Sequence, residues 1–187
     1  MTATLTVLAG ITLLVSGACL GVFFSTGRDQ WGRANDATTA LWALLMTPVA
    51  FEIYARYGER SRWIVGTITA CALAGELVIA ATSGLTAAAL LDWRRSATIG
   101  AVGFAGFLAW MAGVSGFALA WGEMPEALAW FGLVALAATG AAVVLGIRLA
   151  HAGGFDEPRL PPPGQLAVFT LAFLCFPAWC IWLGLAL

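Results

Sequence analysis

Glu76 is the position where the sequence most directly suggests chemistry, because its carboxyl group lies inside a long apolar run. It follows Trp63 by thirteen residues, which at about 1.5 Å per helical residue is roughly 20 Å into a membrane. A carboxyl group at that depth costs several kcal/mol unless it is protonated, paired or hydrogen-bonded, or exposed to a water-filled cavity. Its helical neighbours form a small, weakly polar stripe: Thr69, Ala72, Ala80 and Ser83. We therefore expect Glu76 to face the interior of a helical bundle, as a proton donor, acid catalyst, ligand anchor or interhelical hydrogen-bonding group.

Glu52 is the second candidate acid, five residues before the end of its apolar run. Arg56 follows at i+4, which is the favourable order for a helical ion pair, and a local Glu52–Arg56 pair would account for the residue. Across the short 58–62 turn, Glu52 and Glu76 are offset by nine residues, or about 13 Å along the axis. The two carboxyl groups are expected to flank one elongated cavity without sharing a proton.

Four aromatic residues are the candidates for the walls of such a cavity: Trp42, Trp110, Trp179 and Phe176. Pro48 and Pro177 should kink their helices and free backbone carbonyl groups nearby. Aromatic rings could shape a pocket for a lipophilic molecule or stabilise a developing cation, with Glu76 at the floor. Ordinary core packing explains the same residues without any ligand.

The elements that must position these residues are membrane-spanning helices. Of the 187 residues, 61% are hydrophobic and only 10% are charged, whereas soluble domains carry about 25% charged residues. Long runs that are apolar on every side predict helices rather than strands. We predict an all-α polytopic membrane protein, a single bundle of about six transmembrane helices in one domain, with spans near 3–25, 37–57, 63–83, 97–121, 127–150 and 166–187.

Two local patterns refine this picture. Asp36 immediately precedes the second predicted span, where its carboxylate is expected to cap the free N–H groups of the helix. Glycines in the first and fourth spans should let helices approach closely, inside the bundle or against a partner subunit: Gly17, Gly21, Gly106, Gly113 and Gly116.

Several functions are excluded by missing residue types. The chain has no Lys, which excludes a Walker-type phosphate loop and any Schiff-base cofactor. His151 is the only histidine and the four cysteines form no CxxC pair, so no metal site and no cofactor is predicted. A net charge of −1 gives no basic field for nucleic acid. The expected partners are the lipid bilayer, a lipophilic small molecule or a partner membrane subunit.

Arginine counts predict the orientation of the chain in the cell membrane. Six arginines (Arg28, Arg33, Arg94, Arg95, Arg148 and Arg159) fall in the first, third and fifth connections, against three in the second and none in the fourth. The positive-inside rule then places the odd-numbered connections in the cytoplasm and both termini outside.

Three functions remain open at this point. The first is an intramembrane protein that binds or transforms an isoprenoid- or lipid-like molecule, with Glu76 as the acid of a cyclase- or isomerase-type enzyme. The second is an accessory or assembly subunit of a larger membrane complex, held through its glycine faces. The third is a proton-coupled carrier that uses Glu76 as its titrating group.

Overall fold

The computed structural model describes residues 1–153 and 160–187 of the chain, and every regular element in these residues is an α-helix. The helices are α1 (Thr2–Thr26), α2 (Asp29–Tyr57), α3 (Arg62–Ala87), α4 (Trp93–Trp121), α5 (Glu126–His151) and α6 (Pro163–Ala186). Each is long and apolar enough to cross a membrane. The prediction of six long apolar helices in a bundle is confirmed, and this architecture fits a multi-pass membrane protein.

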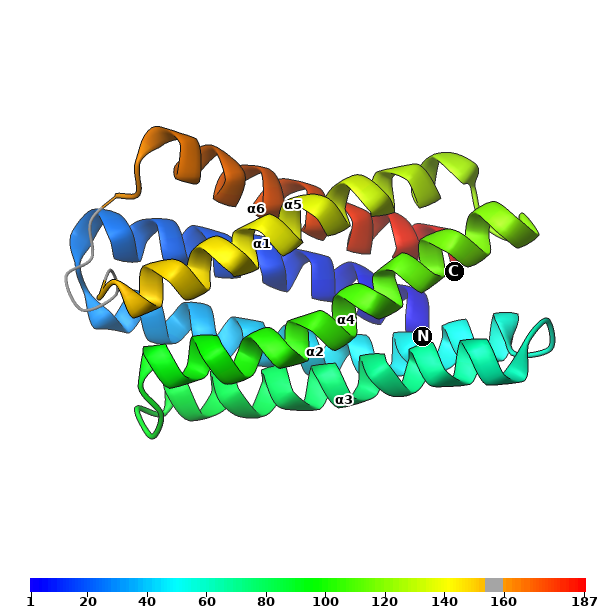
Figure 1. The fold of residues 1–187 in the computed structure, drawn as a ribbon, viewed down its shortest axis with the longest axis horizontal. Coiled ribbons are helices and arrows are strands. Elements are labelled where there is room, and N and C mark those ends of the chain that lie inside the picture. Colours follow the sequence, from blue (N-terminus) through cyan, green and yellow to red (C-terminus); the bar gives the residue numbers. More distant parts are fainter. Residues whose placement is uncertain (154–159) are drawn as a thin grey trace.

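The six helices form a closed ring (Figure 1). Each helix packs against its neighbours in the sequence, and α6 packs against α1 to close the ring. No helix occupies the centre, so side chains from the ring itself decide whether the interior is filled or hollow. Both chain ends lie at one end of the bundle in Figure 1, and the α1–α2 and α3–α4 connections lie at the other.

The second helix begins at Asp29, eight residues earlier than the predicted start at residue 37. Gly27 ends α1 in the left-handed conformation (φ 67°), and Arg28 is extended, so the chain reverses within two residues. The polar stretch that looked like a connection therefore continues as helix. The prediction that Asp36 caps α2 is wrong, because Asp36 lies two turns inside the helix.

Glycines allow α3 and α4 to make backbone contact. A Cβ atom on Gly103 would lie 2.7 Å from the carbonyl oxygen of Gly75, and one on Gly106 would lie 2.6 Å from the carbonyl oxygen of Cys71. Any larger residue at these positions would separate the helices. Of the glycines singled out in the sequence, Gly17, Gly106 and Gly113 do lie against a neighbouring helix.

The remaining two of those glycines behave differently. A Cβ atom at Gly21 or Gly116 would meet nothing within 4 Å. These two positions are therefore not needed for close approach of helices within the chain.

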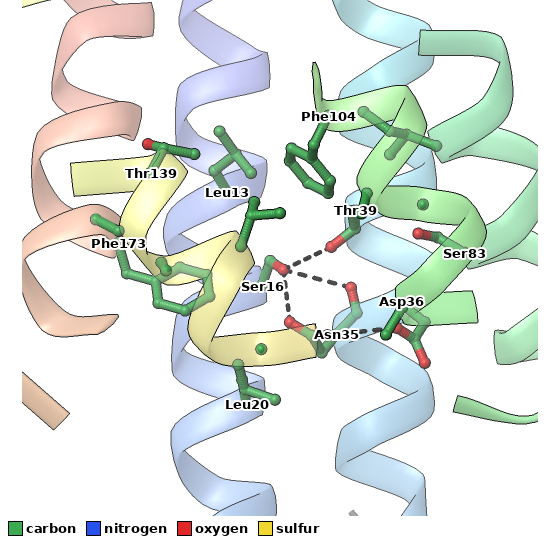
Figure 2. A pocket seen from close by; sticks show the side chains of 18 of the residues that line it. Leu13, Ser16, Leu20, Asn35, Asp36, Thr39, Ser83, Phe104, Thr139 and Phe173 are labelled. Carbon is green, nitrogen blue, oxygen red and sulfur yellow. Dashed lines mark hydrogen bonds between the residues drawn. The ribbon is translucent and has the colours of Figure 1, made fainter. Parts of the chain in front are cut away.

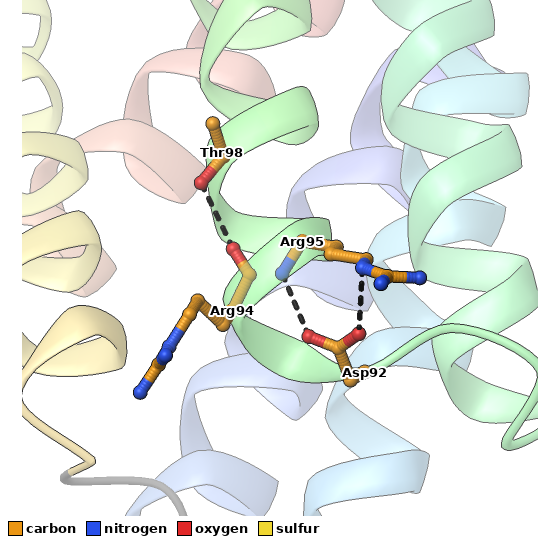
Figure 3. A network of polar contacts seen from close by, with 4 residues as sticks. All are labelled: Asp92, Arg94, Arg95 and Thr98. Atoms are coloured by element: carbon orange, nitrogen blue, oxygen red, sulfur yellow. Dashed lines mark hydrogen bonds and ion pairs between the residues drawn. The ribbon is translucent and has the colours of Figure 1, made fainter.

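The start of α4 is fixed by its capping residue. Asp92 accepts a hydrogen bond from the backbone N–H of Arg95 (2.9 Å), and the Arg95 guanidinium contacts the other carboxylate oxygen at 3.3 Å (Figure 3). Thr98 bonds back to the carbonyl of Arg94 one turn later. This cap places Trp93 in the first turn of α4, where its ring packs on Gly32 of α2 and edge-to-face on Phe23 of α1.

Candidate functional site

Glu76 lies in the middle of α3 and faces the interior of the bundle, with only 1% of its surface exposed. Neither carboxyl oxygen has a hydrogen-bond partner, although the Thr47 side chain on α2 lies close enough to interact with the group. The expectation that Glu76 points inward is therefore confirmed. Thr69 and Ala72, two members of the predicted stripe beside it, are buried on the same helix.

The four predicted aromatic residues meet in the centre of the ring. Trp42 of α2 packs edge-to-face on Phe107 of α4 and on Phe176 of α6, with ring centroids 4.9 and 5.3 Å apart. Trp110 of α4 packs edge-to-face on Trp179 of α6 at 6.1 Å. The three tryptophans are essentially fully buried. We call these five residues (Trp42, Phe107, Trp110, Phe176 and Trp179) the aromatic plug.

Glu52 lies away from this centre, near the end of the ring that carries the chain termini. Its carboxylate accepts a hydrogen bond of 3.5 Å from the Thr2 hydroxyl of α1. Arg56 instead donates to the backbone carbonyls of Ala186 and Leu187, at 3.4 and 3.3 Å. The local Glu52–Arg56 ion pair expected from the sequence is not formed. Arg56 ties α2 to the end of α6, which leaves Glu52 with a structural contact to α1.

The interior of the ring is hollow on the other side of the plug. A cavity of ≈230 Å³ is lined by residues from all six helices. It begins one turn inside the ends of α4 and α5, at Ser96 and Ile147, and reaches Phe104 and Pro177 near the middle of the bundle. Small residues on α4 and α5 keep it open, notably Gly100, Ala101, Ala142 and Gly146.

Polar side chains gather on the α1–α2 side of this cavity (Figure 2). The hydroxyl of Ser16 on α1 donates to the side-chain oxygen of Asn35 at 2.8 Å and shares a hydrogen bond of 2.9 Å with the Thr39 hydroxyl. The Asn35 amide reaches one carboxylate oxygen of Asp36 at 3.5 Å. We call Ser16, Asn35, Asp36 and Thr39 the polar cluster.

Asp36 is the one residue with a formal charge in the cavity lining. Its Oδ2 atom is buried and has no hydrogen-bond partner, while Trp93 and Asn35 lie close enough to stabilise the group. The ion pairs of the described residues are Arg60–Glu123 and Arg95–Asp92, so Asp36 is not balanced by an arginine there. The described lining therefore contains one carboxyl group, beside Trp93 and Asn35, in an otherwise largely apolar cavity.

An apolar groove adjoins the cavity at the seam between α1 and α6. It has a volume of ≈260 Å³, and Thr170 is the one lining residue with a polar side chain. Leu20, Phe169 and Phe173 line both the groove and the cavity, so the two spaces adjoin at these three side chains. The Phe173 ring lies against Gly17, where an added Cβ would be 2.8 Å away.

The predicted site residues and the cavity overlap at one position. Phe176 lines the cavity, whereas Glu76, Glu52, Trp42, Trp110 and Trp179 are not among the lining residues. Glu76 lies one turn beyond Ile79, which forms part of the cavity floor. The polar cluster was missed because the segment 29–36 was read as a connection. The sequence does contain a signal for this cluster: Asn35 and Asp36 precede Thr39 by four and three residues, so all three fall on one face of a helix. No proline in this segment would stop that helix.

Comparison of the chain with protein families, with curated proteins and with solved structures finds no match. The function therefore has to be argued from the geometry of the cavity.

Proposed function

We propose that this protein binds a lipophilic small molecule, isoprenoid- or lipid-like, inside the membrane. The observation that carries the proposal is the cavity, which joins a polar cluster on one side to apolar and aromatic walls on the other. Binding sites for small molecules are concave, mostly apolar and supplied with a few polar groups that fix orientation. This composition suits a molecule with one polar end.

The size of the cavity indicates how much of such a molecule it holds. At ≈230 Å³ it is smaller than the roughly 300–1,000 Å³ of typical ligand pockets. The adjoining groove adds ≈260 Å³ of apolar space on the far side of Leu20, Phe169 and Phe173. In our proposal the polar end of the molecule occupies the cavity and the apolar part lies in the groove, reaching the cavity between α1 and α6.

The residues that contact the molecule follow from this placement. Asn35, Asp36 and Thr39 meet the polar end, and Phe173 and Phe176 contact the apolar part. Glu76 takes no direct part in binding in this proposal, since Ile79 lines the cavity and Glu76 does not. An acid step on the bound molecule would fall to Asp36, the acid among the described lining residues of the cavity.

The proposed orientation follows the arginine distribution. The cavity lies at the end of the ring that carries the α1–α2 and α3–α4 connections, with Arg28, Arg33, Arg94 and Arg95. By the positive-inside rule this end faces the cytoplasm, and both termini are extracytoplasmic. Arg159, which contributes to the same count, lies outside the described residues.

Native mass spectrometry of the protein released from mild detergent, followed by lipid extraction, tests the proposal. We expect a stoichiometric molecule of a few hundred daltons on the wild-type chain. Gly146→Leu should remove it, because Gly146 lines the cavity and an added Cβ there meets nothing within 4 Å. Gly116→Leu is the matched control, since Gly116 is exposed on α4 and has equally open surroundings.

Three results would overturn the proposal. Equal occupancy of the wild-type and Gly146→Leu chains would place the molecule elsewhere. A stoichiometric second polypeptide without a small molecule would favour the accessory subunit. A chain that holds no small molecule, but takes up a solute into liposomes when a pH gradient is applied, would favour the proton-coupled carrier.

A further inference from the structure

The cavity lining combines one acid with several hydroxyl groups, and the hydroxyls of Ser83 and Ser96 make no hydrogen bond within the described residues. The hydroxyl hydrogens of Thr82 and Thr139 are used on backbone carbonyls of their own helices, at 2.8 and 2.7 Å. Ser16 and Thr39 bond to Asn35 or to each other. The acid is Asp36, whose carboxylate can only accept hydrogen bonds.

The charged side chains inside the ring are also acidic, which favours a ligand that carries hydrogen-bond donors or a positive charge. Asp36 lies in the cavity wall and Glu76 lies one turn beyond its floor, and both side chains are acids. Within residues 1–153 and 160–187, the lining holds no arginine or histidine. Arg33, one turn before Asp36 on α2, is exposed and does not pair with it. From the described residues, a phosphate or carboxylate head group would therefore meet a carboxyl group in the cavity and no cation.

Aromatic rings complete the surroundings of the polar cluster. Phe104 and Phe173, both labelled in Figure 2, line the cavity together with Phe169 and Phe176. The faces of aromatic rings attract cations, and this attraction is strongest where water is excluded. A carboxyl group and several rings around one small space are the elements with which proteins hold an ammonium group.

We propose that the polar end of the bound molecule is a cationic amine, held by Asp36 and the surrounding phenylalanine rings. This inference rests on the proposed function, since it names the head-group class of the same site. The molecule is a lipophilic amine whose hydrocarbon part lies in the groove between α1 and α6. The ammonium group donates to the Asp36 carboxylate, which supplies a charge-assisted hydrogen bond.

Three probes with the same ten-carbon tail test the head group: decylamine, 1-decanol and decanoate. Their binding to the full chain in a non-ionic detergent is measured by titration calorimetry at neutral pH, where the amine is cationic and the acid is anionic. We expect decylamine to bind about tenfold more tightly than decanol, the size of one charge-assisted hydrogen bond. Decanoate should bind more weakly than decanol.

Asp36→Asn should reduce the preference for decylamine over decanol to about threefold or less, while decanol still binds. Asp29→Asn is the matched control, because Asp29 is an exposed residue in the first turn of the same helix. This control should keep the full preference, which separates the cavity from general attraction of amines to an acidic surface.

The failure of the inference and the failure of the proposed function give different results. If none of the three probes binds, the cavity is not a lipophilic site and the proposed function falls with the inference. If decanol binds as tightly as decylamine, or decanoate binds best, the cavity binds a lipophile but the amine assignment is wrong. The comparison of the three probes uses the wild-type chain, so the test stands even if Asp36→Asn does not fold.

Discussion

The middle of the ring and its end near the α1–α2 connection are built from the same six helices, yet one is packed and the other is hollow. In the middle, large rings from α2, α4 and α6 meet and fill the centre. At the end, α4 and α5 present Gly100, Ala101, Ala142 and Gly146, which cannot reach across. This difference in side-chain size shows that, in a ring of helices without a central helix, the size of the side chains at each level decides where a cavity forms.

The polar groups divide in the same way. The plug level holds Glu76 and the indole N–H groups of Trp42 and Trp110, whose side-chain polar atoms have no hydrogen-bond partner. The cavity level holds a connected cluster in which Ser16, Asn35 and Thr39 bond one another. The polar groups at the packed level therefore add little to its stability, which comes from the packed rings, whereas those at the hollow level line the space proposed to hold a molecule.

Trp110→Ala should give the largest effect of any single change. Trp110 is fully buried and contacts Phe107 and Trp179, so its removal leaves a large void in the plug. We expect a loss of about 3–5 kcal/mol in the free energy of unfolding, measured by titration with SDS from mild detergent. Val143→Ala, in the cavity wall, should cost less than about 1.5 kcal/mol. Equal losses would contradict the distinction between a packed and a hollow level.

Substituting leucine for each of two glycines on α4, three residues apart, compares how tightly the packed and hollow levels are filled. Gly103→Leu should lose about 1–3 kcal/mol or more, because the new side chain meets the Gly75 backbone of α3, which cannot move aside. Gly100→Leu should be tolerated, since a Cβ there makes an ordinary 3.5 Å contact with the Thr82 hydroxyl and points into the cavity. The two variants are compared by thermal unfolding, with circular dichroism as the measure of helix content. A Gly100→Leu chain as unstable as Gly103→Leu would show that the cavity level is also tightly packed.

Gly21→Phe tests the groove separately from the cavity. Gly21 lines the groove and an added Cβ meets nothing within 4 Å, so the ring should fill the groove without a clash. We expect decylamine binding to weaken about threefold, the loss of roughly one buried methylene of tail contact. Hexylamine, whose short tail stays in the cavity, should bind as to the wild-type chain. Equal weakening of both amines would mean that the groove does not hold the tail.

Glu76→Gln should have the smallest effect. Gln keeps the shape of the side chain, and neither carboxyl oxygen of Glu76 has a hydrogen-bond partner to lose. We expect the free energy of unfolding to change by less than about 1.5 kcal/mol, the worth of one hydrogen bond, and small-molecule occupancy to stay the same. Loss of the bound molecule on a stably folded Glu76→Gln chain would return Glu76 to the site as its acid.

The sequence was sufficient for the helices and for part of the interior. Apolar runs of membrane-spanning length predict all six helices, and the small-residue stripe beside Glu76 predicts its inward direction. The beginning of α2 could not be predicted in this way. Polar residues such as Asp29 and Arg33 resemble a loop in a search for apolar runs, but nothing between them stops a helix.

The cavity was beyond prediction for a different reason. It depends on small side chains from helices distant in the sequence falling at one level, for example Gly100 of α4 opposite Gly146 of α5. The predicted aromatic residues do come together, but they pack on one another, and only Phe176 of that set reaches the cavity. The Glu52–Arg56 ion pair was predicted from the i, i+4 spacing alone, whereas Arg56 donates hydrogen bonds to backbone carbonyls at the end of α6.

Photolabelling with a decylamine derivative that carries a diazirine in its tail would show where in the ring such a molecule binds. Labelled residues are mapped by mass spectrometry with and without excess unlabelled decylamine. We predict that the displaceable labels fall on the cavity and groove, at Leu20, Phe169 and Phe173, and that they disappear in Gly146→Leu. Labels confined to the outer surface, or unchanged by competitor and by Gly146→Leu, would contradict the account.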